Sequence, residues 1–295
     1  MALGALLLDL QPLHGWQLQL WHGDHGWRPD AALQAGELLQ WARSQGLDLQ
    51  LDRADPAPAS EAEARDWRYG CLAEAALRLR CSHVVTGHTA SDRAETVLLN
   101  LARGSHLRGL ASLGASRLLG PGAGALRLAR PLLVFDRDDT GRLCRERSLP
   151  VWEDSSNADP RFARNRLRAD VMPVLEALHP GASRRISAQA ERLEQQLEAE
   201  TELLELALGA LEAEGAPERL QRRRLASLTP ASQRQLLLHW LRRHLEKDPG
   251  SRTLETLVNR LARGGNPGRL DLAAGWQLHW DSRTLWIRTP DALHG

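Results

Sequence analysis

Short apolar segments alternate with longer helical segments through the first half of the chain. Parallel strands need a crossover connection, which is usually a helix, so this alternation is typical of α/β proteins. We therefore predict an α/β fold built on a parallel sheet. The predicted strands cover residues 16–21, 47–51, 83–86 and 126–134, and the predicted helices cover residues 3–10, 31–44, 61–80, 91–103 and 136–147. Ser60 could cap the helix over 61–80, and Gly104 is expected to close the helix over 91–103.

The second half of the chain consists mainly of charged helical segments. Helices are predicted over 183–211, 231–246 and 254–262, and alternating residues over 275–288 predict a β-hairpin that turns at Asp281 and Ser282. A chain of 295 residues is comfortable for two domains. We predict an α/β domain over residues 1–185 and a mostly α-helical domain with a terminal β-hairpin over residues 186–295.

The composition limits the classes of partner. The net charge is +1, so any binding of nucleic acid must use local basic patches. All but one of the 38 basic residues are arginine, the exception being Lys247. Arginine suits phosphate and carboxylate recognition, although a GC-rich genome would produce the same bias.

The cysteines and the apolar segments exclude several further classes. Cys71, Cys81 and Cys144 are odd in number and form no C-x-x-C pair, which argues against a disulfide framework, a zinc ribbon and an iron–sulfur site. No segment reaches the ~20 apolar residues of a membrane span. The apolar start carries Asp9 and no basic region, so it is not a signal peptide. We therefore expect a cytoplasmic protein without a membrane partner.

Two polar loops, at residues 22–28 and 87–92, follow predicted strands. Ligands of open parallel sheets bind at the carboxyl ends of the strands, so both loops are expected to face one crevice. Gly23 and Gly26 would let the backbone approach a ligand, and Arg28 could meet a phosphate. An ordinary polar loop would have the same sequence.

Asp92 and Glu95 lie three residues apart near the start of a predicted helix, and therefore share one face. An ammonium group and Mg²⁺ both bind clustered carboxylate oxygens. The alternative is a solvated first turn, where acids are favoured by the helix dipole.

Residues 154–168 carry the sequence D-S-S-N, followed by R-N-R-x-R. Arg164, Arg166 and Arg168 form a local basic cluster that could neutralise phosphates. The alternative is that Arg168 pairs with Asp154 and joins two elements.

These segments together resemble one family, the tRNA(Ile)-lysidine synthases of the N-type ATP pyrophosphatase superfamily. Residues 86–96 are similar to the family's G-H-H-x-D-D-Q-x-E-T segment, matching at His88, Asp92, Glu95 and Thr96. Residues 22–28 resemble its V-D-H-G-L-R turn, residues 61–69 its E-x-x-A-R-x-x-R-Y helix, and residues 154–168 its D-S-S-N-x-D-P-x-F-x-R-N-R-x-R block. The first segment departs from the family pattern at Thr89, Ser91 and Arg93.

The resemblance implies an adenine nucleotide alpha-hydrolase-like fold and a ligase reaction. ATP, with Mg²⁺, would activate the wobble cytidine of a tRNA(Ile) that has a CAU anticodon, and free L-lysine would then displace AMP. A homodimer is one expected assembly, and no metal ligand is assigned. The implied catalytic residues are His88, Asp92, Glu95 and Arg65; the implied lysine, tRNA or adenylate ligands are Asp92, Glu95, Arg164, Arg166 and Arg168; the implied ATP contacts are His25, Gly26 and Arg28.

The family's phosphate-binding loop, S-G-G-x-D-S, does not occur in the sequence. The start of the chain resembles the helix that follows this loop, so we expect the loop to be encoded upstream of Met1 or to be truly lost. Without this loop, the chain is expected to bind ATP poorly and to be less stable than a form that includes the loop. Two rival functions remain: another tRNA modification on this fold, such as thiolation, and a non-catalytic tRNA-binding remnant. The missing C-x-x-C argues against thiolation.

Overall fold

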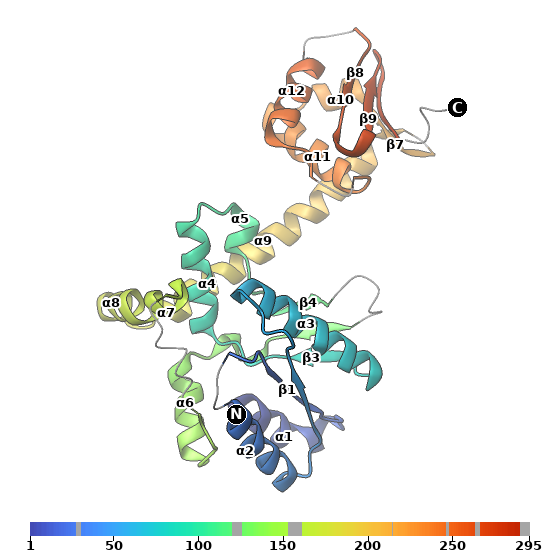
Figure 1. Cartoon of the computed structure of the whole chain (residues 1–295). Coiled ribbons are helices and arrows are strands. Elements are labelled where there is room, and N and C mark those ends of the chain that lie inside the picture. Colours follow the sequence, from blue (N-terminus) through green and yellow to red (C-terminus); the bar gives the residue numbers. More distant parts are fainter. Residues whose placement is uncertain are drawn as a thin grey trace. The chain divides into compact units, whose positions relative to one another are not determined.

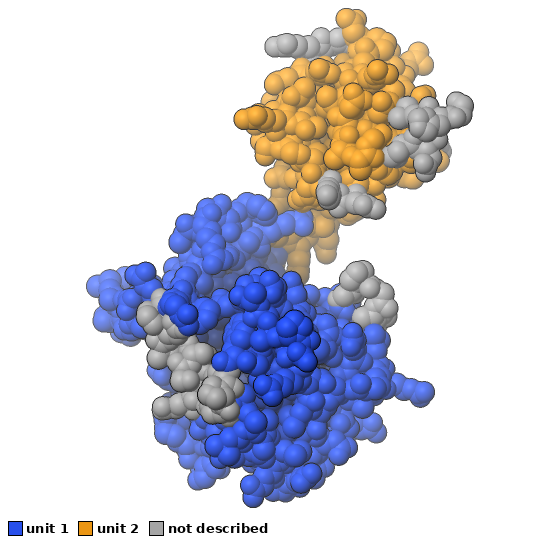
Figure 2. Space-filling model, in the orientation of Figure 1, with its two compact units in different colours: residues 1–194 blue, residues 195–295 orange. Residues whose placement is uncertain are grey.

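A computed structural model describes residues 1–27, 31–119, 126–152, 161–213, 215–245, 248–262 and 266–289. The chain divides into two compact units, Met1–Glu194 and Gln195–Gly295 (Figure 2). The division falls inside α9 (Ala182–Leu211), which contributes residues to both units. Among the described residues, no helix is long and apolar enough to cross a lipid bilayer.

The first unit contains two small sheets with helices around them (Figure 1). In one sheet β1 pairs in parallel with β2, and in the other β5 pairs in parallel with β3 and antiparallel with β4. The parallel pairing confirms the predicted fold class, although the parallel strands belong to two sheets instead of one. The strands are β1 (Leu20–Asp24), β2 (Leu49–Arg53), β3 (His83–Val85), β4 (Ser116–Leu118) and β5 (Arg127–Ala129).

The five helices predicted for this unit are present as α1, α2, α3, α4 and α6, whereas α5, α7 and α8 were not predicted. Ser60 caps α3 by accepting a hydrogen bond from Glu63 N, as its position predicted. The predicted end at Gly104 is also confirmed, because Gly104 follows α4 with a φ of 72° that favours glycine. The helices are α1 (Ala2–His14), α2 (Ala31–Ser44), α3 (Glu61–Arg78), α4 (Ala90–Ala102), α5 (Leu107–Leu110), α6 (Arg137–Glu146), α7 (Ala163–Arg166) and α8 (Met172–Leu178).

Three strand predictions are wrong in their bounds. The strands predicted over 16–21 and 47–51 both lie further along the chain, where backbone pairing runs from Leu20 with Leu49 to Asp24 with Arg53. A polar cross-strand contact, the 3.5 Å ion pair between Arg53 and Asp24, lies at the end of this pairing. The strand predicted over 126–134 stops at Ala129, and Pro131–Val134 is a 3-10 helix, because proline lacks the N–H a strand would donate.

The second unit has an antiparallel sheet of five strands in the order β6-β7-β10-β9-β8. Its inner face and the helices enclose a core that includes Trp240, Leu257, Leu278 and Leu285. The predicted hairpin is confirmed as β9 and β10, but the prediction missed the other three strands, which are short and weakly alternating. The elements are β6 (Glu212–Ala213), β7 (Ala216–Gln221), α10 (Arg222–Ala226), α11 (Pro230–Arg242), α12 (Ser251–Ala262), β8 (Gly268–Asp271), β9 (Gln277–Trp280) and β10 (Thr284–Arg288).

Candidate active site

The first turn of α4 fixes the position of Asp92. Thr89 caps the helix by accepting a hydrogen bond from Asp92 N, and the Asp92 carboxylate accepts in return from Thr89 N over 2.8 Å. This reciprocal capping box satisfies two backbone donors at the helix start. Glu95 lies on the same face and is 1% exposed. Asp92 and Glu95 therefore share one face of α4, as the sequence predicted.

Three arginines surround this acid pair. Arg164 and Arg168 donate to Glu95 over 2.7 and 2.8 Å, and Arg137 donates to Glu95 over 3.2 Å and to Asp92 over 3.0 Å. We call Asp92, Glu95, Arg137, Arg164 and Arg168 the acid–arginine cluster. Three guanidiniums face two carboxylates, so the cluster has a net positive charge.

The cluster keeps both acids ionised. Burial by itself would raise the pKa of the Asp92 carboxyl, but the hydrogen bond from Thr89 N and the charges of Arg137 and Arg164 outweigh it, so the pKa is lowered. Burial likewise opposes ionisation of Glu95, whose pKa is lowered by the hydrogen bonds from Arg168 and Arg164 and by the charge of Arg137. Both side chains therefore carry a negative charge at neutral pH.

The arginine-rich segment divides into two faces. Arg164 and Arg168 lie four residues apart and meet the same carboxylate, whereas Arg166 is 69% exposed and lies 3.8 Å from Asp170. Residues two apart on a helix point to different sides, so the three predicted arginines could not share one face. Asp154 and its neighbours, predicted as part of this site, lie outside the described residues.

Sequence reasoning missed Arg137, which contacts both acids of the cluster. Its backbone N donates to Ser91 Oγ over 3.1 Å, which links the starts of α4 and α6. Asp136 caps α6 in a second capping box, so Arg137 is the first residue of that helix. Nothing in the sequence indicated that this helix start meets α4.

His88 precedes α4 and is kept neutral. Its Nδ1 lies 2.9 Å from Thr86 Oγ1. Burial, with the charges of Arg130, Arg164 and Arg68, outweighs Asp92 and lowers the pKa of His88 to about 4. A neutral imidazole can accept a proton or a hydrogen bond, but this pKa makes it a weak base.

The predicted ATP contacts lie at the end of β1. Gly26 has a φ of 74° and donates its N–H to Asp24 Oδ1, which forms a tight turn. The His25 ring lies 5.2 Å from the Trp27 ring and 3.3 Å from Arg68 Nη2. Arg28 lies outside the described residues.

Of the family-like arginines Arg65 and Arg68 on α3, Arg68 lies nearer to the predicted site residues. Arg65, the predicted catalytic residue, is exposed, and its guanidinium lies 5.7 Å from the centroid of the Tyr69 ring. The charge of Arg68 acts on His88 and that of Arg164 on Arg68, and Arg68 also meets His25. Arg68 therefore connects the β1 loop with the region of α4.

The opposite side of α4 anchors the helix. Arg93, 2% exposed, pairs with Glu194 of α9 over 2.8 Å. A buried charge needs such a partner, so this contact fixes the helix that carries the acids. Sequence reasoning noted Arg93 only as a departure from the family pattern.

The acid–arginine cluster does not fit a bound Mg²⁺. Each of the four carboxylate oxygens of Asp92 and Glu95 already receives hydrogens from two donors. Within the part of the chain that the structure describes, no group of three or more His, Cys, Asp or Glu side chains could hold a metal ion.

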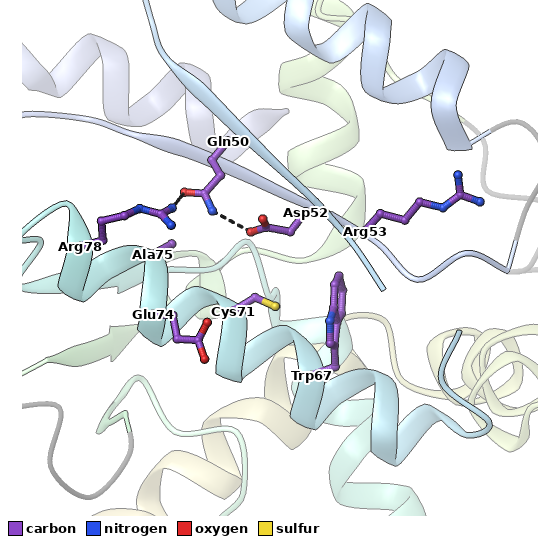
Figure 3. Close-up of a pocket in the computed structure, with 8 residues that line it drawn as sticks. All are labelled: Gln50, Asp52, Arg53, Trp67, Cys71, Glu74, Ala75 and Arg78. Carbon is purple, nitrogen blue, oxygen red and sulfur yellow. Dashed lines mark hydrogen bonds between the residues drawn. The ribbon is translucent and has the colours of Figure 1, made fainter. Parts of the chain in front are cut away.

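A pocket of about 160 Å³ lies between β2 and α3 and carries no predicted site residue (Figure 3). Ligand pockets of proteins usually measure about 300–1,000 Å³, so this pocket is too small for a nucleotide. Its polar groups also bind one another, since Arg78 donates to Gln50 and Gln50 donates to Asp52. The pocket is lined by Gln50, Asp52, Arg53, Trp67, Cys71, Glu74, Ala75 and Arg78.

Comparison with known proteins assigns both halves of the chain to families. Residues 1–175 match the PP-loop domain, and residues 220–286 match the TilS substrate binding domain. The solved U34-tRNA thiolase NcsA from Methanococcus maripaludis, with its [4Fe-4S] cluster, is similar in fold. Its TM-score is 0.52 at 17% identity, over 66% of this chain and 67% of that one.

Two curated relatives are similar over nearly the whole chain. The tRNA(Ile)-lysidine synthase of Parasynechococcus marenigrum is 47% identical over 100% of this chain and 87% of its own length. That of Prochlorococcus marinus is 38% identical over 97% of this chain and 85% of its own length. With the PP-loop match over more than half of the residues, these similarities show that the chain belongs to the tRNA(Ile)-lysidine synthase family.

Proposed function

We propose that this chain ligates free L-lysine to C2 of the wobble cytidine in a tRNA(Ile) with a CAU anticodon. ATP first adenylates the cytidine at C2 through its oxygen and releases pyrophosphate. The lysine ε-amine then attacks C2, AMP leaves, and the new C–N bond forms lysidine. The observation that carries the lysine step is the acid–arginine cluster at the start of α4.

The mixed charge of the cluster complements a free amino acid. The head group of lysine carries one ammonium and one carboxylate, and charge-assisted hydrogen bonds to such groups contribute about 1.5–3 kcal/mol each. Asp92 and Glu95 would hold the α-ammonium, and a guanidinium would hold the α-carboxylate. This arrangement leaves the ε-amine at the other end of the side chain as the nucleophile.

Lysine must replace an existing contact, because all four carboxylate oxygens already have two donors each. Arg137 is the member that can leave most easily. It is 43% exposed, against 33% for Arg164 and 28% for Arg168, and its contact with Glu95 is longer than theirs. Once displaced from the acids, the Arg137 guanidinium can turn to the lysine α-carboxylate.

The ε-amine has to be neutral when it attacks, since an ammonium has no lone pair. The positive charges of the cluster and of Arg68 disfavour a further cation nearby and so favour loss of the proton. His88, which is neutral at pH 7, can accept a hydrogen bond from the amine in this region. Mg²⁺ would be bound by the phosphates of ATP, and no step above depends on it.

The test is a single-turnover assay of the product nucleoside. The protein, with any residues that its gene encodes upstream of Met1, is incubated with ATP, lysine and a CAU-anticodon tRNA(Ile) transcript. The tRNA is then digested and its nucleosides are weighed by mass spectrometry. We expect a cytidine that has gained lysine less one water.

A transcript with uridine at the wobble position is the matched control and should gain nothing. A cytidine or uridine that gains sulfur would instead support the thiolation alternative. Binding of tRNA without any modified nucleoside would support the non-catalytic alternative.

A further inference from the structure

The sheet of the second unit has one face that the core does not use. Alternate residues of β9 and β10, such as Leu278 and Leu285, point into the core with α11 and α12. Their neighbours His279 and Trp286 are half-buried and therefore belong to the opposite face. We call this opposite face the outer sheet face.

Four side chains form a row across the outer sheet face. The register places Arg219 opposite Trp286, Trp286 opposite His279, and His279 opposite Arg269. The His279 and Trp286 rings are stacked, with centroids 5.7 Å apart and planes 20° from parallel. The Arg219 guanidinium lies 5.7 Å from the centroid of the Trp286 ring, on the strand at its other side. Two strands thus supply a pair of rings, and the strands beside them supply arginines.

The charge of the outer sheet face is positive. Arg219, Arg269 and Arg288 are all exposed, and in the described ranges none of them forms an ion pair. Asp271 is an acid of this face whose charge acts on His279, and it accepts a hydrogen bond from Gln277 over 2.8 Å.

Other acids of the same strands act on the opposite side. Glu218 influences His244, and Glu212 pairs with Arg243 of the segment after α11. Three guanidiniums therefore remain against one carboxylate on the outer sheet face.

We infer that the outer sheet face binds unpaired nucleotides of the tRNA substrate. Aromatic rings on the solvent-facing side of a sheet stack with bases, and flanking arginines contact phosphates. A protein ring stacks on the flat face of a base, and in a duplex the neighbouring bases cover that face. Arg219 is exposed and covers the Trp286 ring, so when its guanidinium turns to a phosphate it uncovers one face of that ring for a base.

This inference rests on the proposed function, because it takes tRNA as the partner, and it adds the face and the residues. The alternative is that the row only stabilises the sheet, as cross-strand aromatic pairs do. The two readings differ in what exposed arginine substitutions change, because Arg219 and Arg269 contribute no core packing.

The test measures binding of the CAU-anticodon tRNA at several salt concentrations. The Arg219→Gln/Arg269→Gln variant should weaken binding and lower the slope of log K against log salt by about 1.5, since each lost phosphate contact contributes about 0.7–0.9. Arg234→Gln/Arg252→Gln removes the same charge from α11 and α12 and is the matched control, with an expected slope equal to that of the wild type.

A second pair of variants tests the stacking. Trp286→Leu should weaken tRNA binding about fivefold or more, whereas Trp286→Phe keeps a ring and should bind nearly normally. The urea midpoint of each variant is measured as well, so that a loss of tRNA binding caused by unfolding is recognised. A blunt RNA duplex with the same number of phosphates should bind both variants alike.

The outcomes separate the two proposals. Normal tRNA binding by the arginine and Trp286→Leu variants would overturn the inference and leave lysidine formation intact. An equal effect of Trp286→Leu on the duplex would overturn the choice of unpaired nucleotides. A change in sedimentation of the free arginine variant would instead identify a self-association face. Failure of the wild type to bind tRNA would refute the proposed function itself.

Discussion

The Glu95 carboxylate accepts the Nε hydrogen of Arg164 over 2.7 Å, across 69 residues of sequence. Glu95 is 1% exposed and meets three guanidiniums. Removing one charge from a buried ion pair leaves the other uncompensated, at a cost of about 3–5 kcal/mol. We predict that Glu95→Gln lowers the free energy of unfolding in urea by about 3 kcal/mol, because the arginines retain partial access to water.

Asp170→Asn is the matched control, since Asp170 is 62% exposed and faces Arg166 at 3.8 Å. An exposed pair contributes about 0–1 kcal/mol, so its loss should be hard to detect. Equal destabilisation by both variants would contradict the buried character of the cluster.

Acid should destabilise the first unit in two steps. The folded pKa of His88 is about 4 against an ordinary 6.5, so the unfolded chain takes up this proton first and stability falls as the pH drops from 6.5 to 4. The pKa values of Asp92 and Glu95 are lowered, so their contribution is present above their ordinary values and is lost as the pH falls below those values. Urea midpoints against pH check this, and His88→Gln should flatten the upper step alone.

Arg137 should discriminate lysine from amines that lack a carboxylate. If it turns to the α-carboxylate, Arg137→Gln raises the KM for lysine about tenfold or more, as expected for loss of one charge-assisted hydrogen bond. The KM for 1,5-diaminopentane, which has no carboxylate, should not rise. The ratio of the two KM values is the measurement. A lower KM for both amines would mean that Arg137 only competes for the acids.

Asp92→Asn should separate lysine binding from activation of the tRNA. The amide can still accept the capping hydrogen bond from Thr89 N but has no charge for an ammonium. We expect the KM for lysine to rise about tenfold or more, with the adenylation rate almost unchanged. Equal loss of adenylation, measured by pyrophosphate release without lysine, would refute the assignment.

Arg164 and Arg166 lie two residues apart and should behave differently. Arg164→Ala breaks two contacts with the acid pair and should lower the urea midpoint. Arg166→Ala removes an exposed charge and should leave the midpoint unchanged, while it weakens tRNA binding and lowers the salt slope by about one. A lower midpoint for Arg166→Ala would show that this residue too is structural.

The predictions from sequence succeeded where the signal is local. The caps at Ser60 and Gly104 marked helix ends correctly, because a cap depends on residues within one turn. The shared face of Asp92 and Glu95 also followed from spacing alone. The strand ends did not follow in the same way, because a strand extends as far as its partner does, and the partner lies elsewhere in the chain.

The contrast between local signals and distant partners also explains which site residues the sequence predicted. Arg164 and Arg168 were found through a dense local motif, whereas Arg137 stands in an ordinary helix start and meets Asp92 across 45 residues. Grouping Arg166 with its neighbours failed because density along the sequence says nothing about direction around the helix. The sequence alternation of β9 and β10 was visible, but the Arg–Trp–His–Arg row needed the register of four strands.

The two units should differ in how fast their sheet amides exchange with deuterated water. In the first unit, β1 and β2 each have one neighbour, and β5 alone is flanked on both sides within the described residues. In the second unit, β7, β10 and β9 are all flanked on both sides. A strand with one neighbour leaves alternate N–H groups unpaired. Deuterium should therefore enter the β1–β2 peptides early, while β9 and β10 stay protected until the whole second unit unfolds.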